Sequence, residues 1–189
     1  MFFPENMKLF YIILGATPAG RNIEQHDVFF GIAENLKDLV KEMKKFWPEA
    51  KGKFHIDAYQ EVLFVDGFKL KIVEKTSKIS DDQLFFINLG GYQMGKFEEL
   101  HYQCLMAGKS MSEIIKRVKK TAFYKEMGFK TAESHIDEKL GVDIDDIYKV
   151  KDILSPEMKA KYSIILEKTD EKNQENFTKL GYITINKIK

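Results

Sequence analysis

The feature that most constrains the fold of this chain is an internal repeat. Residues 9–45 align without a gap to residues 84–120, and 11 of these 37 positions carry the same residue. The identical pairs are Leu9/Leu84, Phe10/Phe85, Ile12/Ile87, Leu14/Leu89, Gly15/Gly90, Gly20/Gly95, Glu24/Glu99, His26/His101, Lys41/Lys116, Lys44/Lys119 and Lys45/Lys120. A period of 75 residues is too long for a solenoid unit. It predicts the tandem duplication of a small domain.

The alignment resumes after a five-residue insertion in the second copy. At an offset of 80 residues, His55-Ile56-Asp57 lies over His135-Ile136-Asp137, so all four histidines of the chain fall into matched pairs. We therefore expect a first repeat at residues 1–78 and a second at residues 79–155. Residues 156–189 have no counterpart. Their two apolar runs predict a C-terminal hairpin, which we expect to pack on the second repeat.

Each copy has the same predicted order of elements, β-β-α-β. An unbroken apolar run, at residues 9–14 or 84–89, is typical of a strand that is covered on both faces. A glycine-containing loop, a second strand and an amphipathic helix follow, and Asn35 and Ser110 are suitable caps for the two helices. The predicted fold class is α+β: internally duplicated β-β-α-β modules with helices packed on a mainly antiparallel or mixed sheet.

Composition and charge narrow the choice of partner and compartment. Lys and Arg number 30 against 29 Asp and Glu, for a net charge of +1, so we expect neither nucleic acid nor a membrane as a partner. The single cysteine, Cys104, excludes an intramolecular disulfide and fits a reducing compartment. The apolar N-terminal run resembles a signal peptide, but it recurs at residues 84–89. We therefore interpret it as a strand and predict a cytoplasmic protein.

The motifs of the first copy also carry a resemblance to a known family. LFYIILG, then Glu-x-His-Asp-Val-Phe-Phe, Phe-Trp-Pro and His-Ile-Asp follow one another over residues 9–57. In this order they resemble the bacterial family built on domain of unknown function 1543, whose members carry the module in one or two copies. The resemblance implies two tandem copies here and no particular activity, because the family has none established. The second copy departs from the motif, with Tyr102-Gln103 after its histidine.

The repeated histidines and carboxylates form the first candidate site. Residues two apart in a strand point to the same face, so Glu24 projects with His26, and His55 with Asp57. If the two strands are neighbours, two imidazoles and two carboxylates converge, a donor set that could hold zinc, manganese or iron. The matching set in the second copy is Glu99, His101, His135 and Asp137. A structural hydrogen-bonding network is the simplest interpretation, and a divalent metal site and direct acid–base catalysis are the alternatives.

The glycine-containing loops form a second, weaker candidate site, for a small anion. Residues 90–96 satisfy the spacing G-x-x-x-x-G-K of a phosphate-binding loop, but Phe97 stands where that motif needs Ser or Thr. The residues that could bind an anion are Gly15, Gly20, Arg21, Gly90, Gly95 and Lys96. A plain turn is the favoured interpretation, because glycine supplies the positive φ that connections between strands need.

The overall plan of two histidine-containing modules resembles that of the two-histidine phosphoesterases. Those enzymes hold phosphate with His-x-Thr/Ser, whereas Asp57 and Asp137 occupy the hydroxyl position here and would repel phosphate. We therefore predict a binding or interaction module whose ligand or protein partner is unidentified, and which could form a homo-oligomer. The alternative is a metal-assisted or acid–base hydrolase that uses the duplicated clusters.

Overall fold

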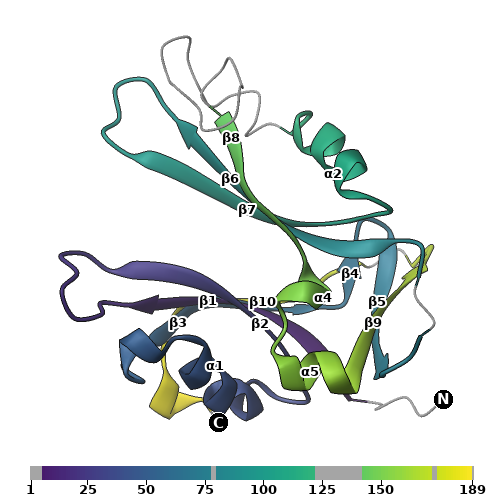
Figure 1. The fold of residues 1–189 in the computed structure, drawn as a ribbon, viewed down its shortest axis with the longest axis horizontal. Helices are drawn as coiled ribbons and strands as arrows, with labels where there is room; N and C mark the ends of the chain where they lie inside the picture. Colours follow the sequence, from purple (N-terminus) through teal and green to yellow (C-terminus); the bar gives the residue numbers. More distant parts are fainter. Residues whose placement is uncertain (1–5, 78–79, 122–141, 172–173, 189) are drawn as a thin grey trace. The chain divides into compact units, whose positions relative to one another are not determined.

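The computed structural model describes residues 6–77, 80–121, 142–171 and 174–188 (Figure 1). The chain divides into two compact units. Unit 1 comprises Met1–Ile79 together with Ile153–Lys189, and unit 2 comprises Ser80–Asp152. The C-terminal segment therefore belongs to the same unit as the N-terminal segment.

The main sheet of unit 1 has four antiparallel strands in the order β10-β3-β1-β2. β1 (Lys8–Ala16) is a central strand, in keeping with its apolar run. β2 (Gln25–Ala33) pairs with one side of β1, and β3 (His55–Val62) with the other. β10 (Phe177–Thr184) extends the sheet beyond β3.

Short helices cover one face of this sheet. η1 (Leu36–Leu39), α1 (Val40–Phe46) and η2 (Pro48–Ala50) connect β2 to β3. Leu39 and Met43 are buried, and Leu39 packs directly onto the backbone of Gly31 in β2. Phe46 makes an edge contact with Phe29 of the same strand, with ring centroids 5.4 Å apart. Since side chains alternate along a strand, the helices cover the face of Phe29 and Gly31, and His26 of β2 projects from the other face.

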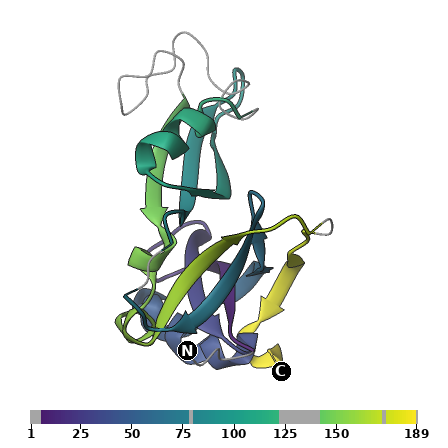
Figure 2. The same cartoon turned by 90° about the vertical axis from the view of Figure 1, so that its right-hand side faces the viewer.

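Unit 1 also contains a smaller sheet, in the order β4-β5-β9. β4 (Phe64–Val65) and β5 (Phe68–Glu74) are joined by Asp66-Gly67, both with positive φ, as a tight hairpin requires. α5 (Pro156–Lys161) leads into β9 (Tyr162–Lys168), which lies beside β5 over the full length of both strands (Figure 2).

Unit 2 is built on one sheet, in the order β7-β6-β8. β6 (Gln83–Tyr92) lies between β7 (Glu99–Gly108) and β8 (Val142–Lys149). α2 (Met111–Val118), whose N-terminus is capped by Ser110, buries Ile114 and Val118 against the sheet. The partners of these two side chains in the core are Phe85, Ile87 and Leu89. α4 (Val150–Ile153) follows β8 directly.

The predicted fold class is confirmed: the fold is α+β, with ten strands in three antiparallel sheets and few helices among the described residues. β2-β1-β3 and β7-β6-β8 share strand order and direction. They also share one irregularity, a register shift after Ile13 in β1 and after Asn88 in β6. Tandem duplication remains a prediction about origin. No helix of the described chain is long and apolar enough to cross a membrane.

The prediction for residues 156–189 is wrong. Instead of pairing with each other as a hairpin on the second repeat, β9 pairs with β5 and β10 with β3, both in unit 1. Apolar runs on either side of a polar loop predict two strands, but they do not reveal which partners the strands choose. The boundary between the units accordingly falls at Ile153.

The predicted correspondence of the His-Ile-Asp segments is also wrong in register. His135 and Asp137 lie outside the described residues, and they precede β8, the strand that pairs with β6. In β8, Asp143 stands opposite Gly90 as His55 stands opposite Gly15 in unit 1.

The structural offset between the third strands is therefore 143 minus 55, or 88 residues, rather than 80. Asp143-Ile144-Asp145 is the counterpart of His55-Ile56-Asp57. The isoleucine and the following aspartate are the same in both segments, but Asp143 stands in place of the histidine. The offset of 80 residues gives the better sequence match because His135-Ile136-Asp137 is identical to His55-Ile56-Asp57, although the strands pair at the other offset.

Candidate functional site

Four of the predicted site residues converge on the main sheet of unit 1. His55 Nε2 lies 3.2 Å from Glu24 Oε1 and 3.1 Å from Asp57 Oδ1. His26 Nε2 lies 3.5 Å from Glu24 Oε2 and 3.3 Å from Asp57 Oδ2. Each imidazole thus faces both carboxylates, and each carboxylate uses a different oxygen for each imidazole. We call these four residues the unit 1 cluster.

A glycine allows this cluster to form. The strands of His26 and His55 are not direct neighbours, because β1 lies between them and Gly15 is opposite both histidines. A Cβ atom on Gly15 would collide with His55 Nε2 and would lie 2.5 Å from Asp57 Oδ2. The side chains therefore meet over the one position of β1 that has none. Gly15, predicted as part of an anion loop, instead forms the floor of the cluster.

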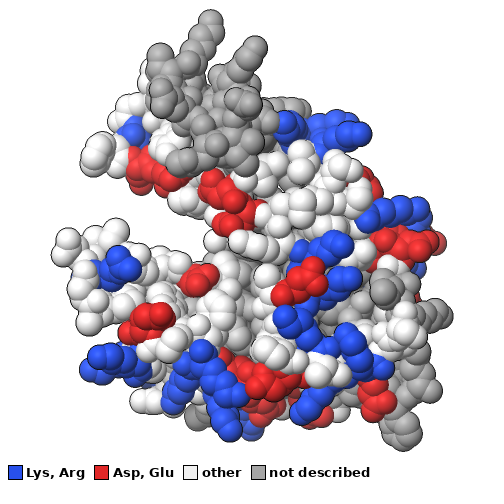
Figure 3. Space-filling view, in the orientation of Figure 1, with Lys and Arg blue, Asp and Glu red and all other residues white. Residues whose placement is uncertain are grey.

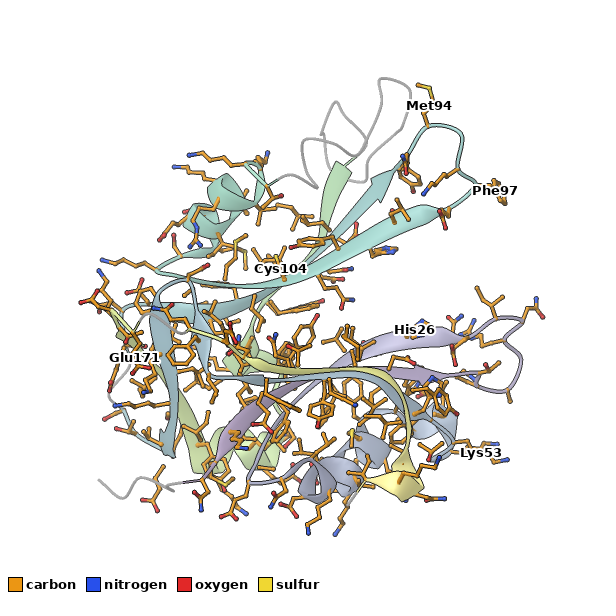
Figure 4. The ribbon with its side chains drawn as sticks, turned by 180° about the vertical axis from the view of Figure 1, so that it is seen from behind. His26, Lys53, Met94, Phe97, Cys104 and Glu171 are labelled. Atoms are coloured by element: carbon orange, nitrogen blue, oxygen red, sulfur yellow. The ribbon has the colours of Figure 1, made fainter. Side chains whose placement is uncertain are left out.

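One end of the cluster is buried and the other is exposed to solvent. The His55 side chain is only 10% exposed, and the ring of Tyr182 in β10 lies over it with centroids 4.2 Å apart. His26, near the start of β2 and close to the turn that joins β1 to β2 (Figure 4), is 51% exposed. Asp57 Oδ2 is buried and accepts no well-aligned hydrogen bond from the described residues, although His26 Nε2 lies 3.3 Å away. A buried carboxylate oxygen without a donor is costly, so this atom marks a position that a ligand could satisfy.

Asp57 owes its place to irregular pairing on both sides of β3. Against β1 the register skips Asp57, because Ile13 pairs with Ala58 and Leu14 with Ile56. Against β10 the register shifts at the same point of β3. Bulges of this kind re-aim a side chain and are common beside functional sites.

Unit 2 holds a related but smaller cluster. His101 Nε2 lies 3.4 Å from Asp145 Oδ2 and 3.9 Å from Glu99 Oε2, and one ligand atom from each residue falls within 4.8 Å of the others. Gly90 is opposite His101, and a Cβ atom there would lie 2.5 Å from Asp145 Oδ2. Asp145 was not among the predicted residues, although the motif Asp-Ile-Asp in β8 carried the signal.

The carboxylates of this second cluster help to raise the pKa of a neighbouring tyrosine, Tyr92. Burial of Tyr92, and then the negative charges of Glu99 and Asp145, raise the pKa of its hydroxyl above its ordinary value. The cluster therefore produces a negative potential at the end of β6. A cation bound there would counteract this potential.

The predicted anion loops are tight turns. The N–H of Arg21 donates to Pro18 O at 3.2 Å, and the N–H of Lys96 donates to Gln93 O at 3.1 Å. Gly20 and Gly95 supply the positive φ values, 83° and 82°. A strand rather than a helix follows each turn, so a phosphate would find no helix N-terminus there.

Comparison with known proteins relates part of the chain to a family without an assigned function. The model of the family described as Domain of Unknown Function (DUF1543) matches residues 21–72, the segment that supplies all four side chains of the unit 1 cluster. No curated protein matches the chain.

A solved structure has a similar fold over nearly the whole chain. The crystal structure of a protein Il1583 from Idiomarina loihiensis has a TM-score of 0.61 and 19% sequence identity, covering 93% of this chain and 95% of that one. At that identity the similarity shows the fold alone, and the function has to be argued from the cluster.

Proposed function

We propose that the protein binds a divalent transition-metal ion at the unit 1 cluster. The observation that carries this proposal is the convergence of two imidazole Nε2 atoms and two carboxylates, with N–O separations of 3.1 to 3.5 Å. Bonds of about 2.1 Å to a first-row metal put neighbouring ligands roughly 3.0 Å apart in octahedral geometry and roughly 3.4 Å apart in tetrahedral geometry. The imidazole–carboxylate separations in the cluster fall close to this range, and because each carboxylate faces the two imidazoles through different oxygens, an ion would draw the four side chains inward.

A network of hydrogen bonds accounts less well for the same geometry. Each Nε2 atom carries at most one hydrogen, so the two imidazoles offer at most two donors to four facing oxygens. Asp57 Oδ2, which accepts no well-aligned hydrogen bond from the described residues, reflects this shortage. A metal ion removes it, because the oxygen then coordinates the ion and requires no donor.

The exposed end of the cluster favours a second candidate function, hydrolysis by a metal-bound water. Glu24 and His26 are 44% and 51% exposed, so an ion held between them could keep a coordination position open to solvent. Catalytic metal sites keep such a position, in which the pKa of bound water is lowered. We infer that metal binding comes first and that any hydrolase activity depends on it.

The shared strand order and register shift support a further part of the proposal, that the units arose by tandem duplication. On this view unit 2 retains a glycine floor, one histidine and two carboxylates, and has an aspartate at the position of His55. Basic and acidic side chains are interspersed over the face in Figure 3, which supports a partner other than nucleic acid.

Elemental analysis of protein purified without a metal-affinity tag tests the proposal. We expect zinc, manganese or iron at about one ion per chain, lost in His26→Ala and retained in His101→Ala, the matched control in unit 2. His26 is half exposed, so its replacement should leave the fold intact. Wild-type protein that takes up no divalent metal, either during expression or on titration to about 1 mM, would overturn the proposal.

A further inference from the structure

We propose that Tyr182 is a positioning residue of the unit 1 cluster, whose ring holds the His55 imidazole so that Nε2 faces both carboxylates. This inference rests on the proposed metal-binding function. It assigns a role to the C-terminal strand, which lies outside the segment matched by the family model.

Tyr182 lies directly against the imidazole ring of His55. The two ring centroids are 4.2 Å apart, with planes inclined by 33°. The rotation of an imidazole about its last side-chain bond is only broadly restricted by intrinsic preference, so its orientation depends on what packs against it. Because Tyr182 is 67% exposed, its position is not explained by burial in the core.

The backbone of β10 is shaped to deliver this ring. Leu180 pairs with Ala58 and Ile183 with Ile56, so Gly181 and Tyr182 together stand opposite Asp57 alone. Gly181 has a φ of 108°, a conformation that residues with a Cβ rarely adopt. The bulge thus uses a glycine to place Tyr182 beside the cluster.

Unit 2 provides an internal comparison. β8 is an edge strand of its sheet in the described chain, without a counterpart of β10 on its free side. It also carries Asp143 at the position of His55. Among the described residues, the aromatic strand therefore accompanies the sheet that carries the buried imidazole, in keeping with a role beside it.

The test compares three variants of the full chain by titration with Co²⁺, whose visible spectrum reports the coordination geometry. Tyr182→Leu removes the flat ring and keeps an apolar side chain, Tyr182→Phe keeps the ring, and Leu180→Ala is a control at another exposed apolar residue of the same strand. Hydrogen-bonding residues that orient a metal-binding histidine contribute about tenfold or more to affinity, and we expect the lower end of that range for a packed ring. We therefore expect Tyr182→Leu to bind Co²⁺ about tenfold more weakly and with an altered spectrum.

The two control variants distinguish positioning of the His55 ring by Tyr182 from a general effect of substitution on β10. We expect Tyr182→Phe and Leu180→Ala to match wild type in affinity and spectrum, and the melting temperatures of all metal-free proteins to agree. If Tyr182→Leu melts early, Tyr182→Met repeats the comparison. Wild-type affinity in the variant without a ring, or equal weakening in Tyr182→Phe, overturns the positioning role alone. Failure of wild type to bind Co²⁺ overturns the proposed function and this inference with it.

Discussion

Replacing Gly15 with alanine should separate the stability of unit 1 from its ability to bind metal. The Cβ atom would collide with His55 Nε2 and would lie 2.9 Å from His55 Cε1 and 2.5 Å from Asp57 Oδ2. These atoms are the ends of side chains, so the backbone of β1 can stay in place while the imidazole and carboxylate move. The displaced atoms are those that we propose as ligands.

The expected cost to stability is modest, because two effects oppose each other. Alanine is favoured over glycine in a strand by about 0.5–1 kcal/mol, since glycine loses more backbone freedom on folding. Overpacking a filled site costs about 1–3 kcal/mol, and His55, 10% exposed beneath Tyr182, has little room to move. The net destabilisation should be at most about 2.5 kcal/mol, or roughly 5–10 °C in melting temperature for a chain of this size.

The assay is thermal unfolding of the metal-free protein together with titration with Zn²⁺ or Co²⁺. We expect Gly15→Ala to remain folded and to lose at least a hundredfold in metal affinity. Gly90→Ala is the matched control, because its Cβ atom would crowd Asp145 in unit 2 and leave the unit 1 cluster intact. A Gly15→Ala protein that binds metal with wild-type affinity would refute the inferred role of the glycine floor.

Three further predictions follow from particular contacts. Gly181→Ala forces a side chain into a φ of 108°, so we expect a loss of about 1–2 kcal/mol in urea unfolding and weaker metal binding; unchanged values for both would contradict the proposed bulge. The pKa of Tyr92 should lie above the ordinary value for tyrosine, because burial and the charges of Glu99 and Asp145 disfavour its ionised form; the ultraviolet absorbance difference between wild type and Tyr92→Phe measures this, and an ordinary pKa would contradict the negative potential inferred at the end of β6. Asn176→Ala removes three hydrogen bonds of 2.7 to 2.8 Å to the backbone of Leu63 and Phe64, where β3 gives way to β4, so the free energy of unfolding should fall by about 2–3 kcal/mol; a loss below about 0.5 kcal/mol would show that the tail is held by other contacts.

The local pattern of apolar and polar residues predicts the strands and helices, and it predicts which side chains share a face of a strand. The apolar run at 84–89 became the central strand β6, and Glu24 meets His26 as His55 meets Asp57, as alternation predicts, although Glu24 precedes β2 and Asp57 lies at a bulge of β3. Alternation acts within a strand, however, and does not reveal which strands are neighbours. The two histidine strands could therefore be expected to meet, but not to meet across Gly15.

Register and long-range pairing were beyond what the sequence could show. His135 matched His55 in residue type, whereas the pairing of β8 put Asp143 at the equivalent position. The tail likewise had the composition of two strands, and its partners were fixed by the unpaired edges of β3 and β5 rather than by its own residues. Both errors concern which residues pair across strands, whereas the period of two along a strand determines only which face each side chain joins.

The unit 1 cluster is therefore a property of the folded unit rather than of one segment. The four proposed ligands lie between residues 21 and 72, the part that the family model matches. The glycine over which they meet precedes that part, and the aromatic ring over His55 comes from a strand more than a hundred residues beyond it. A fragment limited to residues 21–72 would contain every ligand, yet it would lack the central strand that separates the two histidines. We therefore expect metal binding to be lost from such a fragment, and to depend on the C-terminal strand even though no proposed ligand lies there.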